Sequence, residues 1–370
     1  MEHIDSRMLT QVRLEFDNKL DDAMKMLQNP TDAFNQLAIG SVDDRTRCRF
    51  PSSPLSIEFK NMLGLNGEVK PVFSNLADGS IITLFDKTPF PREKDDVICP
   101  HFIELKWANG CNFDCAWCYL NGTMRFRPGG KQPYFKEKNK VINHVKKYLQ
   151  QITFPSLLNS GELSDSLVFE GNGSALSKLI IPLFKQQDMH KLLILTKSTN
   201  IQKVLSSKSQ ECTIVSFSIN SFDVAKRWEK KAPSPKQRIQ AAKKLYDAGY
   251  TIRMRLDPIV PLENWEYGYK EVIDYLFEHL VPERITLGSL RGLQSTINYS
   301  KDRSWVKYLN ETSNWGKKIG FETRYKMYKI MIAYLKRRYK FTNIGLCKET
   351  MEMWDKLGMN YQDIKCNCIL

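Results

Sequence analysis

The chain has 370 residues, of which 42% are hydrophobic and 26% charged, a composition that excludes disorder over most of its length. It contains no apolar run long enough for a membrane span, and its N-terminal segment does not resemble a signal peptide, so we expect a cytoplasmic protein without membrane contact. The nine cysteines argue against a secreted disulfide framework and favour metal or redox use of some of them. The net charge of +14 favours a polyanionic partner, although a generally lysine-rich surface would give the same excess.

Residues 1–97 are expected to form an accessory region, with an amphipathic helix near the start and then segments punctuated by proline and glycine. Their sequence indicates no chemistry. From residue 98 to about residue 300, short apolar runs alternate with longer helical patterns, and residues 301–370 form a basic C-terminal region. These three ranges are the predicted domains.

Six apolar runs in the central range predict strands. They are FIELKW from Phe102, SLVFE from Ser166, LLILT from Leu192, TIVSFSI from Thr213, TIRMRL from Thr251 and RITLGSL from Arg284. Apolar residues at three- and four-residue spacing predict helices between them, as in KNKVINHVKKYLQQ and KQRIQAAKKLYDAG. Repeated strand and helix units predict an α/β fold with a parallel sheet, and six units are too few for a full eight-stranded barrel.

The most basic stretch is residues 301–340, which contain 12 Lys or Arg and three acidic residues. The spacing of its apolar residues predicts a helix whose buried face carries Phe321, Tyr325, Tyr328, Ile332, Leu335 and Tyr339. The opposite face leaves Lys326, Lys329, Arg337 and Arg338 available to phosphates.

The most specific motif is GCNFDCAWCYL, in which Cys111, Cys115 and Cys118 follow the first predicted strand with the spacing C-x3-C-x2-C. Three thiolates on one loop suit a [4Fe-4S] cluster, because each holds one iron and the fourth iron stays open for chemistry. A tetrahedral zinc site would need a fourth ligand, and no further Cys or His follows before His144.

This motif resembles that of the radical S-adenosylmethionine (SAM) superfamily. The segments CPHFIELKWANGCNFDCAWCYLNGT, LTKSTN, FSINS, RLDPIVP, NWEYGY and ITLGSLRG occur in an order similar to that of the spore photoproduct lyase-like branch, over roughly residues 98–295. The triplet alone indicates the superfamily, whereas the ordered segments indicate the branch.

The resemblance implies a partial (β/α)6 barrel with N- and C-terminal extensions and with the cluster and SAM at the C-terminal ends of the strands. It implies reductive cleavage of SAM to a 5′-deoxyadenosyl radical, with the electron supplied by a reductase, a flavodoxin or a ferredoxin. The residues at SAM-contacting positions are Trp117, where the branch usually has tyrosine, and Tyr119, Gly161, Glu162, Lys197 and Ser218.

Glu162 has two interpretations. Aligned on the following Ser-Asp, it stands where the photoproduct lyases carry a hydrogen-donating cysteine, and a carboxylate cannot donate a hydrogen atom as a thiol does. Together with Gly161 it instead resembles the Gly-Glu element that binds the SAM amino group through charge-assisted hydrogen bonds. The lyase reaction itself does not follow from the sequence.

Three more cysteines, Cys347, Cys366 and Cys368, form a candidate auxiliary site for a second Fe-S cluster or zinc. The alternative is a tail without a metal. Cys48, Cys99 and Cys212 read as ordinary buried or loop cysteines.

These features predict a radical SAM enzyme that abstracts hydrogen from a nucleic-acid base, with thymine or a modified thymine in DNA favoured. Such a base must be drawn out of the duplex, and phosphate contacts must offset that cost. The alternatives are a radical SAM enzyme acting on RNA, a peptide or a small molecule, and a non-catalytic Fe-S protein that binds nucleic acid.

Overall fold

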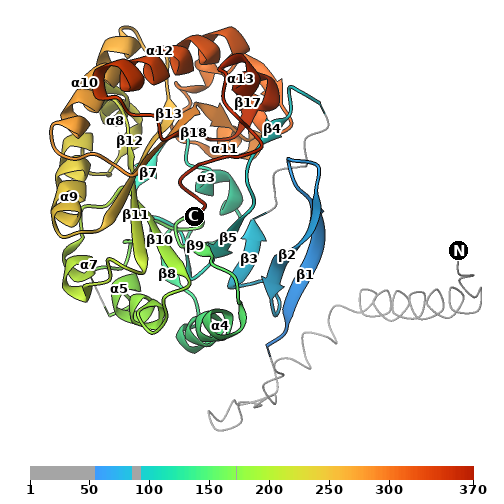
Figure 1. Cartoon of the computed structure of the whole chain (residues 1–370). Coiled ribbons are helices and arrows are strands. Elements are labelled where there is room, and N and C mark those ends of the chain that lie inside the picture. Colours follow the sequence, from blue (N-terminus) through green and yellow to red (C-terminus); the bar gives the residue numbers. More distant parts are fainter. Residues whose placement is uncertain (1–54, 86–92, 172) are drawn as a thin grey trace, which may run out of the picture. The chain divides into compact units, whose positions relative to one another are not determined.

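The structure is a computed structural model that describes residues 55–85, 93–171 and 173–370 (Figure 1). Within these residues, a ten-stranded sheet runs in the order β1-β2-β3-β5-β9-β10-β11-β13-β14-β18. Its seven consecutive parallel strands are β5 (Phe102–Leu105), β9 (Leu157–Asn159), β10 (Lys191–Thr196), β11 (Thr213–Ile219), β13 (Thr251–Ile259), β14 (Arg284–Ser289) and β18 (Ile344–Leu346). The sheet curves with helices on its outer side, so the predicted α/β partial barrel is confirmed.

Helices follow the strands in the expected alternation. They are α4 (Lys138–Gln151), α5 (Leu176–Leu179), α6 (Ile181–Phe184), α7 (Gln202–Ser207), α9 (Pro235–Asp247), α10 (Trp265–Phe277) and α12 (Phe321–Tyr339). In α9, the Ser234 and Gln237 side chains each accept a hydrogen bond from the other residue's amide, and Pro235 occupies the first turn. Gly249, at a φ of 85°, then turns the chain into β13.

Shorter elements connect this framework. The paired short strands are β4 (Val97–Ile98) with β19 (Glu349–Thr350), β6 (Ala108–Asn109) with β8 (Tyr134–Phe135), and β7 (Asp114–Cys115) with β12 (Glu229–Lys230). A further small sheet consists of β15 (Arg291–Gly292), β17 (Gly316–Lys318) and β16 (Glu311–Ser313). The short helices are α3 (Leu120–Thr123), α8 (Phe222–Trp228), α11 (Gln294–Tyr299), α13 (Met351–Lys356) and the 3-10 turn η1 (Val306–Tyr308). Among the described residues, no helix combines the length and the apolar composition needed to cross a bilayer.

The strand predicted from Ser166 is wrong. Residues 166–170 form turns, and the Asp165 carboxylate accepts a hydrogen bond from the Leu167 amide at 2.9 Å. Leu167 is buried, so the apolar run indicated burial correctly but not extended backbone. The parallel strand at this place in the sheet is the three-residue β9, which pairs with β5 and β10.

The basic C-terminal region contributes α12 and the additional parallel strand β18. The predicted apolar face of α12 is only partly buried: Tyr328, Ile332 and Leu335 are buried, whereas Phe321, Tyr325 and Tyr339 are half-buried. Because α12 connects the parallel strands β14 and β18, it runs opposite to them. Its last turn, with Arg337 and Arg338, therefore lies at the end of the barrel where the strands begin.

Strands from the predicted N-terminal region extend the same sheet. β1 (Ile57–Leu63), β2 (Val69–Leu76) and β3 (Ile82–Phe85) pair antiparallel, and β3 continues antiparallel onto β5. The predicted amphipathic helix near the start of the chain and Cys48 lie outside the described residues. The domain boundaries at residues 97 and 300 stay predictions.

The C-terminal tail fills the barrel interior near the strand starts, and in Figure 1 the C-terminus lies over the barrel centre. Arg253 of β13 donates to the carbonyls of Asn367 at 3.0 Å and Ile369 at 2.6 Å. The fully buried Asn367 side chain bonds to the Ser216 hydroxyl, the Met254 carbonyl and the Thr286 hydroxyl. Because these hydrogen bonds pair the buried polar groups of the tail, they fix the tail inside the barrel.

We expect His190 to make the stability of this framework pH-dependent. Its ring is buried between Ser156, at 2.8 Å from Nδ1, and the Ile152 carbonyl, at 3.1 Å from Nε2. Burial lowers the His190 pKa, so the unfolded chain binds a proton at a higher pH than the folded chain. We expect the free energy of unfolding to fall as the pH drops below about 6.5, by up to about 1.4 kcal/mol per pH unit from this group.

Urea denaturation of the wild type and of His190→Gln between neutral and mildly acidic pH measures this effect. The variant should be less stable at neutral pH and should show a shallower loss on acidification. Equal slopes for the two proteins would contradict the assignment.

Candidate active site

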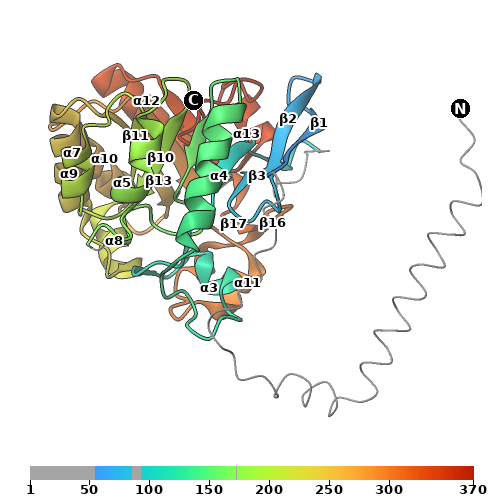
Figure 2. The same ribbon diagram turned by 90° about the horizontal axis from the view of Figure 1, so that it is seen from below.

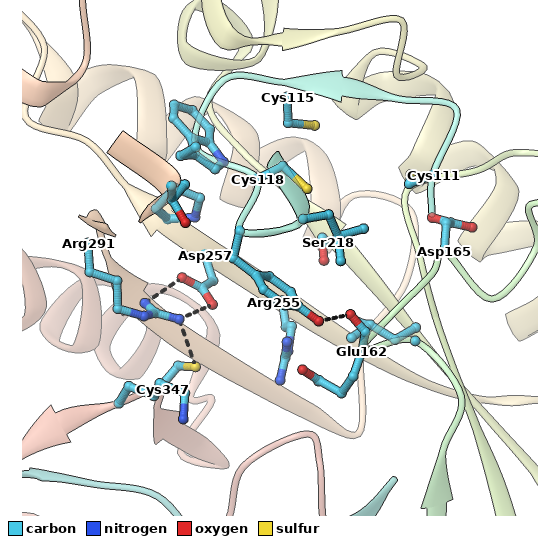
Figure 3. A pocket seen from close by; sticks show the side chains of 18 of the residues that line it. Cys111, Cys115, Cys118, Glu162, Asp165, Ser218, Arg255, Asp257, Arg291 and Cys347 are labelled. Carbon is cyan, nitrogen blue, oxygen red and sulfur yellow. Dashed lines mark hydrogen bonds and ion pairs between the residues drawn. The ribbon is translucent and has the colours of Figure 1, made fainter. Parts of the chain in front are cut away.

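A cavity of about 370 Å³ lies at the C-terminal ends of the parallel strands (Figure 3). The nine residues that the sequence predicted for cluster and SAM all line it: Cys111, Cys115, Trp117, Cys118, Tyr119, Gly161, Glu162, Lys197 and Ser218. They come from the loop after β5, the loop after β9 and the ends of β10 and β11. The fold therefore brings together residues that are far apart in the chain, at the face where parallel barrels carry their chemistry.

The loop with the cysteine triplet is held by backbone hydrogen bonds on both sides. The Cys111 amide donates to the Lys131 carbonyl at 2.8 Å, and the Ala116 amide donates to the Trp228 carbonyl at 2.8 Å. Between them, β7 pairs with β12, with Cys115 opposite Glu229. The backbone of the loop is thus held by contacts that do not depend on a metal.

Two thiols of the triplet, Cys111 and Cys115, have raised pKa values. Burial raises the pKa of Cys111 and raises that of Cys115 to about 12, and the neighbouring cysteines of the triplet add to both shifts. The Cys111 and Cys115 thiols are therefore protonated when no metal is present. Iron binds thiolates, so loading a cluster here would release protons.

Glu162 is positioned from both sides. The Asn159 side chain donates to Glu162 Oε1 at 3.1 Å, and the Tyr119 hydroxyl donates to the Glu162 carbonyl. Gly161 lies against Leu195, and a Cβ at this position would come within 2.4 Å of the Leu195 Cβ. Glycine is therefore the residue that allows this close approach of the β9 loop to β10.

Lys197 is the partly buried member of an ion cluster beside the cysteine loop, whose other members, Glu229 and Arg238, are buried. The Lys197 ammonium lies 3.6 Å from Glu229, which also lies 2.6 Å from Arg238. Burial alone would raise the pKa of the Glu229 carboxyl, but the two cations hold this pKa below its usual value. Arg238 also donates to the Ser218 carbonyl at 3.0 Å, which ties this cluster to the end of β11.

The residues fit a cluster with a bound SAM. Three thiols on one anchored loop supply the donors that an Fe-S cluster needs, and the fourth iron would face a cavity large enough for a ligand. The buried indole N–H of Trp117 has no hydrogen-bond partner among the described residues, so it is available to a bound group.

Sequence reasoning missed the opposite wall of the cavity. Arg291 forms a bidentate pair with Asp257, at 2.9 and 3.0 Å, and Arg255 lies beside them on β13 (Figure 3). Burial alone would raise the pKa of the Asp257 carboxyl, but Arg291 holds this pKa below its usual value. The sequence did contain a signal for this wall. Residues two positions apart in a strand point to the same side, so Arg255 and Asp257 could have been expected on one face.

The candidate auxiliary cysteines are divided between the cavity and the tail. Cys347 lines the cavity and accepts from Arg291 at 3.3 Å, and Cys368 lines it and accepts from Arg255 at 2.7 Å. Cys366 is buried in the tail, while Cys99, given no role from sequence, also lines the cavity. In the described part of the chain, no three His, Cys, Asp or Glu side chains gather closely enough to hold one metal ion, and this includes the triplet, in which each thiolate would hold a different iron of a cluster. The auxiliary site stays a prediction.

A partial parallel barrel with a cysteine triplet after its first parallel strand defines a radical SAM fold. The sequence profile of the family described as "Spore photoproduct lyase" matches residues 102–357. Because this match covers more than half of the chain, the chain belongs to the spore photoproduct lyase family. The predicted family resemblance is confirmed.

Individual relatives are more distant. The chain is 27% identical to the spore photoproduct lyase of Bacillus subtilis over 229 residues, 58% of this chain and 65% of the relative. It is 28% identical to that of Clostridium acetobutylicum over 177 residues, 46% of this chain and 50% of the relative. The matched regions thus span less than two thirds of these relatives. A solved spore photoproduct lyase complexed with dinucleoside spore photoproduct has the same fold, with a TM-score of 0.57, 20% identity and coverage of 71% of this chain and 80% of that chain.

Proposed function

We propose that this chain is a radical SAM enzyme that abstracts a hydrogen atom from a nucleic-acid base, with thymine or a modified thymine in DNA as the substrate. The observation that carries the proposal is the meeting of all nine predicted cofactor residues at one cavity, at the C-terminal ends of the strands. The family to which the chain belongs supports the same reaction class.

In this proposal, Cys111, Cys115 and Cys118 hold a [4Fe-4S] cluster. When bound, the reduced cluster and SAM supply a 5′-deoxyadenosyl radical that abstracts hydrogen. Glu162 accepts hydrogen bonds from the SAM amino group, and its own orientation is fixed by Asn159. Trp117, Tyr119, Gly161, Lys197 and Ser218 form the rest of the SAM-facing wall. A reductase, a flavodoxin or a ferredoxin supplies the electron.

DNA is favoured as the substrate for two reasons. The net charge of +14 suits a polyanion, and one of the relatives named spore photoproduct lyase was solved in complex with a dinucleoside, the dinucleoside spore photoproduct. Because a base inside a duplex cannot enter a cavity, the target nucleotide must be extruded, and basic residues around the cavity would offset that cost.

The Glu162 role is tested by Glu162→Gln. This substitution replaces a charge-assisted hydrogen bond by a neutral one and should weaken SAM binding about 5- to 30-fold, equivalent to about 1–2 kcal/mol. Equilibrium dialysis of reconstituted wild type and variant with labelled SAM measures it. Unchanged SAM affinity together with failed substrate turnover would place Glu162 in the substrate site instead.

Anaerobic turnover of the reconstituted enzyme with DNA and RNA pools, followed by nucleoside mass spectrometry, tests the proposal as a whole. A DNA nucleoside that changes only when SAM is consumed would support it. Turnover with RNA or with a peptide would favour the alternative substrates, and an intact cluster without SAM cleavage would favour a non-catalytic Fe-S protein that binds nucleic acid.

A further inference from the structure

The segment directly after the cysteine loop carries an exposed cluster of rings and arginines, which we call the aromatic–arginine patch. Its members are Arg125, Phe126, Arg127, Tyr134 and Tyr299. Phe126 is 79% exposed, more than any other large hydrophobic side chain among the described residues. Burying such a ring would contribute about 1.5–3 kcal/mol, so leaving it in water has a cost that a ligand could recover.

The patch adjoins the cavity through two short helices. Arg125, Phe126 and Arg127 follow α3, and Tyr299 ends α11, which packs against α3. Both helices contribute cavity-lining residues, Thr123 from α3 and Thr296 from α11. Figure 2 shows α3 and α11 side by side at the end of the barrel that lies away from the C-terminus. A ligand on the patch is therefore placed beside the cavity.

The arginines are arranged over the rings. The Arg125 guanidinium lies 4.0 Å from the centre of the Phe126 ring and 5.6 Å from that of Tyr299, and Arg127 lies 4.2 Å from that of Tyr134. Carbonyl oxygens of Gly122 and Gln132 accept hydrogen bonds from these arginines and orient them. In the part of the chain that the structure describes, neither arginine pairs with a carboxylate, so both keep charge for an anionic partner.

The surroundings of the patch are also positive. Lys131 and Lys301 both lie within ion-pair distance of Asp114 in the cysteine loop, at 3.2 and 3.7 Å. Hydrogen bonds from Ser304 lower the pKa of Asp302, and nearby Arg227 and Lys230 lower it further. Cations thus outnumber acids on the loops that surround the cavity, which favours a polyanion over a neutral protein surface.

We propose that the aromatic–arginine patch binds a single-stranded or locally opened stretch of DNA beside the cavity, with Phe126 stacked on an unpaired base and Arg125 and Arg127 on the flanking phosphates. The ring faces of bases are hidden in a duplex, so an exposed ring flanked by cations selects unstacked nucleotides. The inference rests on the proposed function, because it assumes a nucleic-acid substrate. It adds the place and the manner of its binding.

Binding of the reconstituted full chain to a labelled single-stranded oligothymidylate, and to an abasic strand of equal length, tests this inference. Phe126→Ala should weaken binding to oligothymidylate about 5- to 150-fold, the loss expected for one base stack, and should leave binding to the abasic strand unchanged. The double variant Arg125→Gln, Arg127→Gln should reduce the log-log salt slope by about 1.4 for two lost phosphate contacts. SAM cleavage without substrate should be unaffected by any of these changes.

Matched controls lie at the other end of the barrel. Tyr246 near the end of α9 is also an exposed ring, and Arg337 and Arg338 are exposed cations of α12. Tyr246→Ala should leave oligothymidylate binding unchanged. Although the sequence made Arg337 and Arg338 available to phosphates, they lie at the end of the barrel away from the cavity, so Arg337→Gln with Arg338→Gln should leave the salt slope unchanged.

Equal oligothymidylate affinity for wild type and Phe126→Ala would overturn the inference, as would an equal loss on the abasic strand. If either result came with intact DNA-dependent turnover, the proposed function would survive and only the binding mode would fall. Absence of any DNA binding by the wild type would overturn both, whereas SAM cleavage alone reports separately on the cofactor site.

Discussion

Alanine in place of Cys115 is expected to reduce reductive SAM cleavage by more than about a thousandfold, because the cluster carries the chemistry and cannot form with two thiolates on the loop. The same loss is expected for Cys111 and Cys118. Since backbone bonds to Lys131 and Trp228 hold the loop, the substitutions should leave the fold intact.

Iron and sulfide analysis with electron paramagnetic resonance, and chromatographic measurement of 5′-deoxyadenosine, check this result. Cys212→Ala is the matched control, because Cys212 is also buried but does not line the cavity. It should keep both the cluster and SAM cleavage. Full SAM cleavage by any variant of the triplet would contradict the assignment of these cysteines as cluster ligands.

Glu229→Gln is expected to destabilise the protein by about 3–5 kcal/mol, because it leaves the buried Arg238 and the partly buried Lys197 without their counter-ion. Glu229 is 3% exposed and lies 3.6 Å from Lys197 and 2.6 Å from Arg238. It also stands opposite Cys115 in the short ladder that anchors the cysteine loop. The variant should therefore lose both stability and the efficiency of cluster loading.

Urea denaturation of the metal-free protein measures the stability change, and iron content after reconstitution measures the second effect. Asp247→Asn is the control, since it breaks the exposed ion pair with Lys243 and should change stability by less than about 1 kcal/mol. A similarly small change for Glu229→Gln would show that this ion cluster is not needed for the fold.

Much of the barrel could be predicted because its strands are long and apolar. TIVSFSI is fully buried as β11, and RITLGSL contains β14. Two parallel strands escaped because β9 and β18 have three residues each, too few for a periodic pattern to identify them. The apolar run from Ser166 was wrongly predicted to be a strand because an apolar run indicates burial, and a buried segment need not have extended backbone.

The candidate site divides in the same way. The cysteine triplet, Glu162 and Lys197 stand in motifs that a single sequence displays. The Asp257–Arg291 pair and the tail thiol of Cys368 meet only through long-range folding, since the tail reaches the cavity by threading Asn367 between β11, β13 and β14. No local sequence pattern predicts a contact between residues as far apart in the chain as Arg255 and Cys368.

The transfer of deuterium from a labelled nucleic acid into 5′-deoxyadenosine tests the central proposal most directly. Reconstituted enzyme would be supplied with SAM, a reductant and DNA in which the thymine residues carry deuterium. We predict deuterated 5′-deoxyadenosine with the wild type, and none with Cys115→Ala. Efficient SAM cleavage in which 5′-deoxyadenosine never gains deuterium from DNA would contradict the proposed hydrogen abstraction from thymine.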